Sequence, residues 1–280
     1  MSINTGIATA AAGAPSPAAV ADYDGTTPFT DDAGPPATFQ GRVRAGVTAT
    51  IVAVPFAGLG VAVWLAWGRG LNLADVLMAV VFYGITGLGV TIGFSPYRYG
   101  ASLAGQLRGL AHAHAGWLLR DDPTPPERYA PDMTADRSMR AVSAAFPALC
   151  ALSLALPFGA GWLIGGSWRT ALLGLLWAGL VRVTVLQHVT WSVNSLCHVF
   201  GNRPFATRRH DRATNLWPLA LVSFGESWHN MHHSDPACAR HGAEPGQIDI
   251  SASVIRVFER LGWATGVHWP DPDRLAARRR

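Results

Sequence analysis

Long uncharged apolar segments alternate with arginine-rich polar ones along the chain. No residue between Arg44 and Arg69 is charged, and the sequence AGVTATIVAVPFAGLGVAVWLAWG fills this interval. A helix needs about 20 apolar residues to cross roughly 30 Å of hydrocarbon. This pattern predicts a membrane span at residues 45–68, and similar segments predict further spans at residues 75–94, 141–166 and 170–191.

Two of the links between the predicted spans are short. GRGLNLAD joins the first span to the second, and GGSWR joins the third to the fourth. Short links require neighbouring antiparallel helices. The expected fold class is therefore an all-α integral membrane protein with four transmembrane helices in two hairpins. A helical cap on the cytoplasmic side is expected from residues 95–140 and 192–270.

The first 41 residues differ from the rest of the chain. They are rich in Ala, Pro, Gly and Asp and show no apolar periodicity. This composition predicts a disordered leader before a membrane domain of residues 42–280. The leader lacks the basic start and apolar stretch of a secretory signal.

Charge placement predicts the orientation of the spans. The short links carry one arginine each, Arg69 and Arg169, whereas the central loop and the region after residue 200 carry many more. Under the positive-inside rule, both termini and the central loop lie in the cytoplasm. We expect a multi-pass protein of a bacterial cell membrane with the lipid bilayer as a partner. The basic regions lack interleaved aromatic residues, so no nucleic-acid partner is expected.

One charged residue, Arg182, interrupts the fourth predicted span. An ionisable side chain at that depth faces a polar interior or marks a functional site. Alternatively, the long arginine side chain extends to the membrane interface. The sequence leaves both interpretations open.

A histidine cluster lies near the end of the chain, in GESWHNMHHSDP at residues 225–236. His229, His232 and His233 have the spacing i, i+3 and i+4, which places them on one face of a helix. Neutral imidazoles that converge on one point bind metals such as iron or zinc. The alternative is a solvated histidine cluster, but its position beside a membrane, directly after Trp228, favours metal binding.

A second polar segment, QHVTWSVNSLCHVFGNRPF at residues 187–205, follows the last predicted span. If the span continues as a helix, one sector of about 120° carries five polar or aromatic side chains. These are His188, Trp191, Asn194, Ser195 and His198. This face could form part of a metal cage, although His188 alone also fits a hydrogen-bonded histidine at the membrane interface.

Other chemistries fit the sequence poorly. Glu226 precedes the histidine cluster, whereas zinc proteases carry the glutamate inside HExxH. The chain has no GxSxG nucleophile elbow and no phosphate-binding loop. The three cysteines, Cys150, Cys197 and Cys238, have no CxxC spacing and indicate no disulfide framework.

The two polar segments together resemble the third histidine region of membrane fatty acid desaturases, specifically the acyl-CoA Δ9 (stearoyl-CoA) type. TWSVNSLCHVFGNRPF matches the pattern N-S-x-x-H-x-F-G-x-R-P-[YF], and GESWHNMHH matches G-E-x-[WY]-H-N-x-H-H. HAHAGWLL at residues 112–119 is similar to the segment before the third span of the family. The resemblance covers roughly residues 45–270.

The resemblance implies an enzyme whose diiron centre uses O₂ and electrons to insert a double bond into an acyl chain. The implied iron ligands are His198, His229, His232 and His233, with Asn194 holding a water at one iron. Residues that would surround and support the site are His188, Trp191, Glu226, Asn230 and Arg182. The implied partners are acyl-CoA or another acyl lipid and a separate ferredoxin- or cytochrome-like electron donor with its reductase.

The sequence departs from the family pattern in one region. The family also carries an HxxxxH box after the second span and an additional HxxHH box, and this chain has neither. VTIGF, which ends at Phe94, runs directly into SPYRYGASLAGQLRGL from Ser95, as expected for an internal deletion. Two functions are therefore open: an active desaturase, or a catalytically inactive remnant or other non-enzymatic membrane protein.

Overall fold

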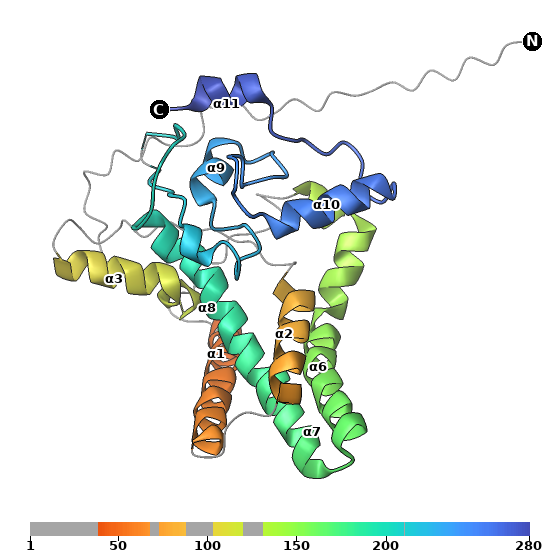
Figure 1. The fold of residues 1–280 in the computed structure, drawn as a ribbon. Helices are drawn as coiled ribbons and strands as arrows, with labels where there is room; N and C mark the ends of the chain where they lie inside the picture. Colours follow the sequence, from red (N-terminus) through yellow and green to blue (C-terminus); the bar gives the residue numbers. More distant parts are fainter. Residues whose placement is uncertain (1–38, 68–72, 88–102, 120–130, 210) are drawn as a thin grey trace, which may run out of the picture. The chain divides into compact units, whose positions relative to one another are not determined.

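A computed structural model describes residues 39–67, 73–87, 103–119, 131–209 and 211–280 (Figure 1). Helices are the regular elements of these ranges, in agreement with an all-α fold. Among the described residues the β-pairing consists of isolated bridges, such as those of Asn215 with Asn202 and with Trp228. The predicted leader remains a prediction, because residues 1–38 lie outside the described residues and helix α1 begins at Phe39.

Three helical segments are long and apolar enough to cross a membrane. The first is Gly46–Ala66 within α1 (Phe39–Ala66), and the second is α6 (Arg137–Gly165). The third, Trp168–His198, consists of α7 (Trp168–Gly174), the π-helical segment η3 (Leu175–Val181), α8 (Arg182–Ser195) and the 3-10 turn η4 (Leu196–His198). These helices are those of a membrane protein.

A fourth apolar helix, α2 (Leu73–Gly87), is shorter than the other three. Residues 88–94, which would complete the predicted second span, lie outside the described residues, as does the Phe94–Ser95 junction. The arrangement of four spans in two hairpins therefore remains a prediction.

Glycines allow the backbones of α6 and α7 to approach closely. A Cβ atom at Gly161 would lie 2.4 Å from the carbonyl oxygen of Thr170, and one at Gly174 would lie 2.4 Å from that of Pro157. Small residues serve this purpose in membrane helices, where close van der Waals packing holds the helices together. The segment η3 follows α7 and contacts α1, α2 and α6.

Arg182 lies at the start of α8 and is only 3% exposed. Its Nε donates to the carbonyl of Ala178 at 2.8 Å, and Nη2 donates to that of Ser153 at 3.1 Å. The side chain thus bonds to backbone carbonyls of the helices instead of reaching the interface. Of the two interpretations left open by the sequence, this geometry supports a polar contact in the interior. His198 lies roughly 24 Å further along the same helical run at 1.5 Å per residue.

As predicted from the sequence, the last apolar helix continues past residue 191 and ends at His198. The described part of the predicted cap contains short helices joined by long connections. They are α3 (Leu103–His114), η2 (Gly116–Leu119), α5 (Pro131–Ala135), η5 (Trp217–Leu219), α9 (His229–Ser234) and α10 (Ile250–Arg260). A further short helix, α11 (Pro272–Arg278), follows the predicted cap.

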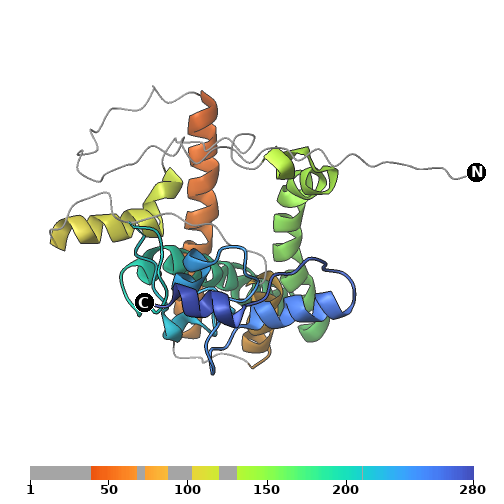
Figure 2. The ribbon, with the colours of Figure 1, turned by 90° about the horizontal axis from the view of Figure 1, so that it is seen from above.

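The helices α9, α10 and α11 lie beyond the end of α8 that carries His198 (Figures 1 and 2). Helix α3 packs against α8. A small core of Phe205, Met231 and Cys238 forms inside this region, and Leu275 of α11 packs against it. This core holds the loop after η4, helix α9 and helix α11 together around the histidine cluster.

Candidate metal centre

Three histidines from two segments converge at the end of the last apolar helix. His198 comes from η4, and His229 and His233 come from successive turns of α9. The Nε2 atom of His229 lies 3.2 Å from Nε2 of His198 and 3.1 Å from Nε2 of His233. One ligand atom from each residue lies within 4.8 Å of those of the other two. Nitrogens bound to one ion at about 2.0–2.1 Å are roughly 2.9–3.4 Å apart, so the two close pairs at His229 have the spacing of ligands of a shared metal ion.

Hydrogen bonding alone does not account for this arrangement. His233 Nδ1 lies 2.6 Å from Oδ2 of Asp211, so it carries the proton and donates to the carboxylate. When His233 is neutral, its Nε2 atom then carries a lone pair that points at His229. The Nε2 atom of His229 has either one proton or one lone pair and completes at most one of its two close N···N contacts. A cation bound by the three nitrogens would account for the close N···N contact that a hydrogen bond does not explain. Three imidazole nitrogens are a ligand set that suits a transition metal.

Burial keeps two α9 histidines, His229 and His232, in the neutral form that binds metals. His229 is 3% exposed, and its pKa lies well below the ordinary value because of burial and because of the neighbouring histidines. Burial, together with His241 and His233, lowers the pKa of His232 to about 4. Metal binding requires neutral imidazole, so these side chains are ready to ligate at neutral pH.

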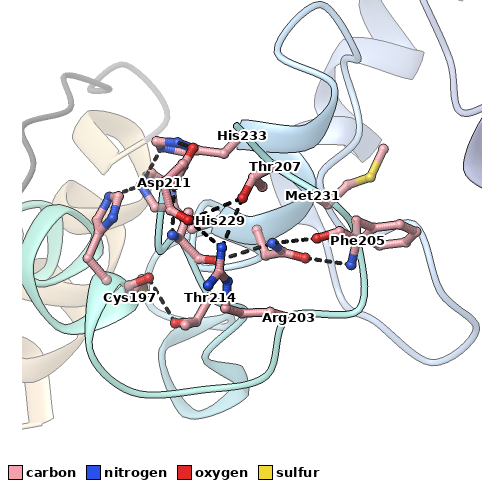
Figure 3. A network of polar contacts seen from close by, with 12 residues as sticks. Cys197, Arg203, Phe205, Thr207, Asp211, Thr214, His229, Met231 and His233 are labelled. Atoms are coloured by element: carbon pink, nitrogen blue, oxygen red, sulfur yellow. Dashed lines mark hydrogen bonds and ion pairs between the residues drawn. The ribbon is translucent and has the colours of Figure 1, made fainter. Parts of the chain in front are cut away.

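The loop between η4 and η5 positions His233 through Asp211 (Figure 3). The backbone N–H of Ala213 donates to Oδ1 of Asp211 at 2.8 Å, and the Arg203 side chain donates to the Asp211 carbonyl. Burial acts to raise the pKa of Asp211, but the hydrogen bonds from His233 and Ala213 outweigh it, and the pKa is lower than usual. A carboxylate that receives the second imidazole proton fixes the tautomer and orientation of a metal-binding histidine.

Two asparagines hold α9 in place. The Oδ1 atom of Asn215 accepts from the backbone N–H groups of Asn230 and Met231 at 2.9 and 3.3 Å, and so satisfies the start of the helix. Asn230 is fully buried. Its side chain donates to the carbonyls of Phe205 and Ala213 and accepts from the N–H of Phe205. Asn230, predicted as a residue around the metal, thus joins α9 to the loop that carries Asp211.

The fourth predicted ligand, His232, faces a different neighbour. Its ring centroid lies 4.6 Å from that of His241, and its buried Nδ1 has no hydrogen-bond partner among the described residues. His241 Nδ1 lies 3.5 Å from Oε2 of Glu226, another predicted residue. Burial and the negative charge of Asp249 raise the pKa of Glu226 to about 7. Of the four predicted histidine ligands, three therefore converge, and the fourth, His232, lies beside His241 instead.

A second histidine pair joins α3 to α8. His114 Nε2 lies 2.9 Å from Nδ1 of His188, and His114 Nδ1 lies 2.9 Å from Oγ of Ser195. The Ser195 hydroxyl donates to the carbonyl of Trp191, so it accepts from His114 Nδ1–H, and His188 Nδ1–H then donates to His114. The Nε2 atom of His188 is left as a buried lone pair, without a hydrogen-bond partner in the described ranges. This geometry supports a hydrogen-bonded histidine at position 188.

Two other predicted residues lie on α8. Asn194 is buried, and its Nδ2 donates to the carbonyl of Thr190 at 3.4 Å. The Trp191 ring meets the rings of His188 and His114 edge-on. That Asn194 holds a water bound to the metal remains a prediction.

No motif or spacing in the sequence points to Asp211 or His241 as part of the site. Both stand alone in their segments, without a partner at helical spacing. They reach the histidines because loops bring them there, and a pattern search along the chain does not detect such contacts. His112 and His114 lie two residues apart, which is not the spacing of either missing histidine box.

The convergent histidines at the end of apolar helices define a membrane protein with a candidate transition-metal centre. No protein-family model matches the chain. The chain is 36% identical over 185 residues to hex-5-enoyl-(acyl-carrier protein) acetylenase of Moorena producens. The aligned residues make up 66% of this chain and 57% of that protein. Over 167 residues it is 32% identical to sn-1 stearoyl-lipid 9-desaturase of Anabaena variabilis, 59% of this chain and 57% of that protein.

A plant protein gives higher identity over a shorter region. The chain is 47% identical over 96 residues to Delta-9 acyl-lipid desaturase 1 of Arabidopsis thaliana, 34% of this chain and 31% of that protein. These similarities support membership of the fatty acid desaturase family. It spans little more than half the length of the two bacterial relatives, 57% in each case.

Proposed function

We propose that this chain is an acyl-chain desaturase, an oxidoreductase that inserts a double bond into a fatty acyl chain at a histidine-bound iron centre. The observation that carries the proposal is the convergence of His198, His229 and His233 within 4.8 Å. These three histidines would hold iron, which would supply activation of O₂ for the removal of two hydrogens from neighbouring carbons. Two electrons from a separate donor and two protons complete the reduction of O₂ to two waters.

The side chains divide the work of holding this centre. His198, His229 and His233 provide the lone pairs, Asp211 orients His233, and Asn215 and Asn230 hold α9. The remaining predicted ligands, His232 and Asn194, would serve the second iron of a diiron centre, with His241 beside His232. The apolar helices that end at the site suit an acyl chain held in the bilayer.

The substrate and the partners follow from the family. The relatives are named for acyl groups on an acyl-carrier protein and on lipids. We propose an acyl lipid, acyl-CoA or acyl-carrier substrate, and a ferredoxin- or cytochrome-like donor with its reductase. Such a donor would dock on the arginine-rich cytoplasmic side through complementary charge.

A catalytically inactive remnant is the second candidate, and one observation favours it. The chain lacks the HxxxxH box and the additional HxxHH box of the family, so the described residues bring only three imidazoles to one point. Oxidation of an unactivated C–H bond requires a complete ligand set and its supporting residues.

Expression in a host with a competent electron donor distinguishes the two candidates. Gas chromatography of total fatty acids should show a new unsaturated product that disappears in the His233→Ala variant. If the chain gives no product, a family segment with both missing boxes should be inserted between Phe94 and Ser95. Product from the insertion variant alone would establish the remnant and overturn the proposed activity of this chain.

A further inference from the structure

Helix α10 presents its apolar face outward. Val254, Val257, Phe258 and Leu261 have the spacing i, i+3, i+4 and i+7, so they form one stripe. In a surface helix of a globular protein such a stripe normally faces the core. Here Val257 is 49% exposed, Phe258 is 42% exposed and Leu261 is 55% exposed.

The opposite face of α10 is held to the protein by polar contacts. Trp269 Nε1 donates to both carboxylate oxygens of Glu259, at 3.0 and 3.1 Å. The Arg256 guanidinium lies over the Trp269 ring, 3.5 Å from its centroid. Ala252, on the same side, is buried. These contacts fix the rotation of the helix, so the outward direction of the apolar stripe is a property of the fold.

The end of α10 adds an aromatic side chain to this stripe. Gly262 has a φ of 73° and ends the helix, with its N–H donating to Glu259 O at 3.0 Å and the Trp263 N–H donating to Phe258 O at 2.8 Å. This pair of bonds is a Schellman motif, which brings the residue after the glycine onto the last turn. The Trp263 ring accordingly lies 5.6 Å from that of Phe258 and is 73% exposed.

Helix α10 begins beside the apolar helix α2. The Ser251 N–H donates to the carbonyl of Phe224 at 2.9 Å, and the Phe224 ring stacks on Tyr83 of α2 at 5.7 Å. The Tyr83 hydroxyl donates to Val222 O at 2.6 Å. The same turn exposes Leu221, at 62%. Figure 1 shows α10 lying crosswise to α2 and α6.

We propose that α10 and Trp263 form a membrane anchor that lies in the phospholipid interface of the bilayer. An outward apolar stripe with Phe, Leu and Trp, backed by charged residues, is the composition of helices that lie in this layer. Tryptophan favours the same depth. The exposed Arg260, off the stripe, suits the phosphate layer. The link through Phe224 to Tyr83 holds the start of α10 beside the apolar helix α2.

The anchor also bears on the position of the candidate metal centre. Asp249, the N-cap of α10, accepts from Ala252 N at 2.9 Å and from the backbone N–H groups of His241 and Gly242 at 2.8 and 3.0 Å. The loop that carries His241 beside His232 is therefore joined to the start of the anchor. A fixed α10 would hold this loop at a constant height above the bilayer. The proposal does not depend on metal binding or on the proposed activity.

The test uses the full chain in vesicles of phosphatidylcholine and phosphatidylglycerol. Cys150 is exposed and is replaced by alanine, whereas Cys197 and Cys238 are buried. A Leu261→Cys variant is labelled with an environment-sensitive fluorophore. Two matched variants calibrate the signal: Leu152→Cys on the exposed surface of α6 for lipid, and Ala277→Cys on α11 for water. All three positions are exposed, so the substitutions disturb no buried contact.

We expect phospholipids with brominated acyl chains to quench the label at position 261 at least half as strongly as the label at position 152. Aqueous iodide should quench it several-fold less than the label at position 277. A label at Ser253, on α10 but off the apolar stripe, should respond less to bromolipid than the label at position 261. Quenching at 261 that matches 277 would overturn the anchor, because the face would then be open to water or to a soluble partner. Equal bromolipid quenching at 253 and 261 would also overturn it.

Discussion

At the scale of single residues, the two neighbouring histidines of α9 have different surroundings. His233 directs Nε2 at His229 and donates from Nδ1 to Asp211, whereas His232 packs beside His241. Adjacent residues on a helix are about 100° apart, so one face of α9 does not serve both in the same way. The same substitution at His232 and at His233 therefore compares two different surroundings within one turn of α9.

The first prediction compares His233→Ala with His232→Ala. We expect His233→Ala to reduce the bound metal of the purified protein more strongly, because it removes one of three convergent nitrogens. Loss of a ligand or of its supporting contact typically costs about 10–100-fold in metal affinity. Iron and zinc per chain are measured by mass spectrometry after purification in detergent. Equal metal loss in the two variants would show that His232 belongs to the same ion, and retention in both would remove the site.

The second prediction concerns Glu226, whose pKa burial and Asp249 raise to about 7. In the window between the ordinary value of 4.5 and about 7, the folded state keeps a proton that the unfolded state has lost. The stability contributed by this proton is complete below about pH 4.5 and is lost as the pH rises through about 7. Glutamine is neutral throughout, so Glu226→Gln should raise Tm relative to the parent protein at pH 8 and by less at pH 5.

Thermal unfolding in detergent at the two pH values measures this difference. Glu244→Gln is the control. Glu244 lies in the loop before α10 and forms an ion pair with the exposed side chain of Arg279. A Tm difference for Glu226→Gln that is equal at pH 5 and pH 8 would contradict the assigned protonation of Glu226.

At the scale of elements, α9 depends on contacts from outside itself. It has only six residues, and its N-cap residue, Trp228, makes no capping hydrogen bond from its side chain. Such a short helix is unstable alone, because the few hydrogen bonds of one or two turns do not offset the entropy lost when the helix nucleates. Asn215 replaces the missing cap from the loop fifteen residues before Asn230.

The third prediction is that Asn215→Ala destabilises the region around α9. Two backbone N–H groups, of Asn230 and Met231, would lose their acceptor in a buried site. The expected loss is about 1–3 kcal/mol in the free energy of unfolding. Urea unfolding followed by tryptophan fluorescence measures it. The control is Asn202→Ala, an exposed asparagine of the same loop that should change stability little.

At the scale of the whole molecule, the arginines predict which end of each span faces the cytoplasm. The positive-inside rule predicts both termini and the central loop on that side. His198, His229 and His233 of the candidate metal centre lie at or after the end of the last apolar helix, so topology decides which compartment the centre faces.

The fourth prediction follows from this orientation. Reporter fusions at Gly70 and Gly166 should give the outer-side signal, and fusions at Asp132 and Arg280 should give the cytoplasmic signal. Alkaline phosphatase and fluorescent-protein fusions report the two sides in bacterial cells. A cytoplasmic signal at Gly166 would contradict the turn between α6 and α7 as an outer link, and would remove one span.

The sequence by itself determined the apolar helices and the part of the chain that carries the candidate metal ligands. Uninterrupted apolar runs specify membrane helices because the bilayer leaves no other way to satisfy the backbone. The local spacing of His229 and His233 also specifies their shared face, since one helical turn separates them. The motif around His198 and α9 identified the family, because both segments are continuous in the sequence.

Only the tertiary structure decided which side chains meet. It joined His198 to α9, Asp211 to His233, His241 to His232, and His114 to His188. It also turned the apolar stripe of α10 outward, where periodicity alone predicts a stripe that faces a core. The physical reason is that these contacts join segments far apart in the chain, whose paths depend on packing and on loop hydrogen bonds. Local periodicity specifies a face of a helix, and the fold determines what that face meets.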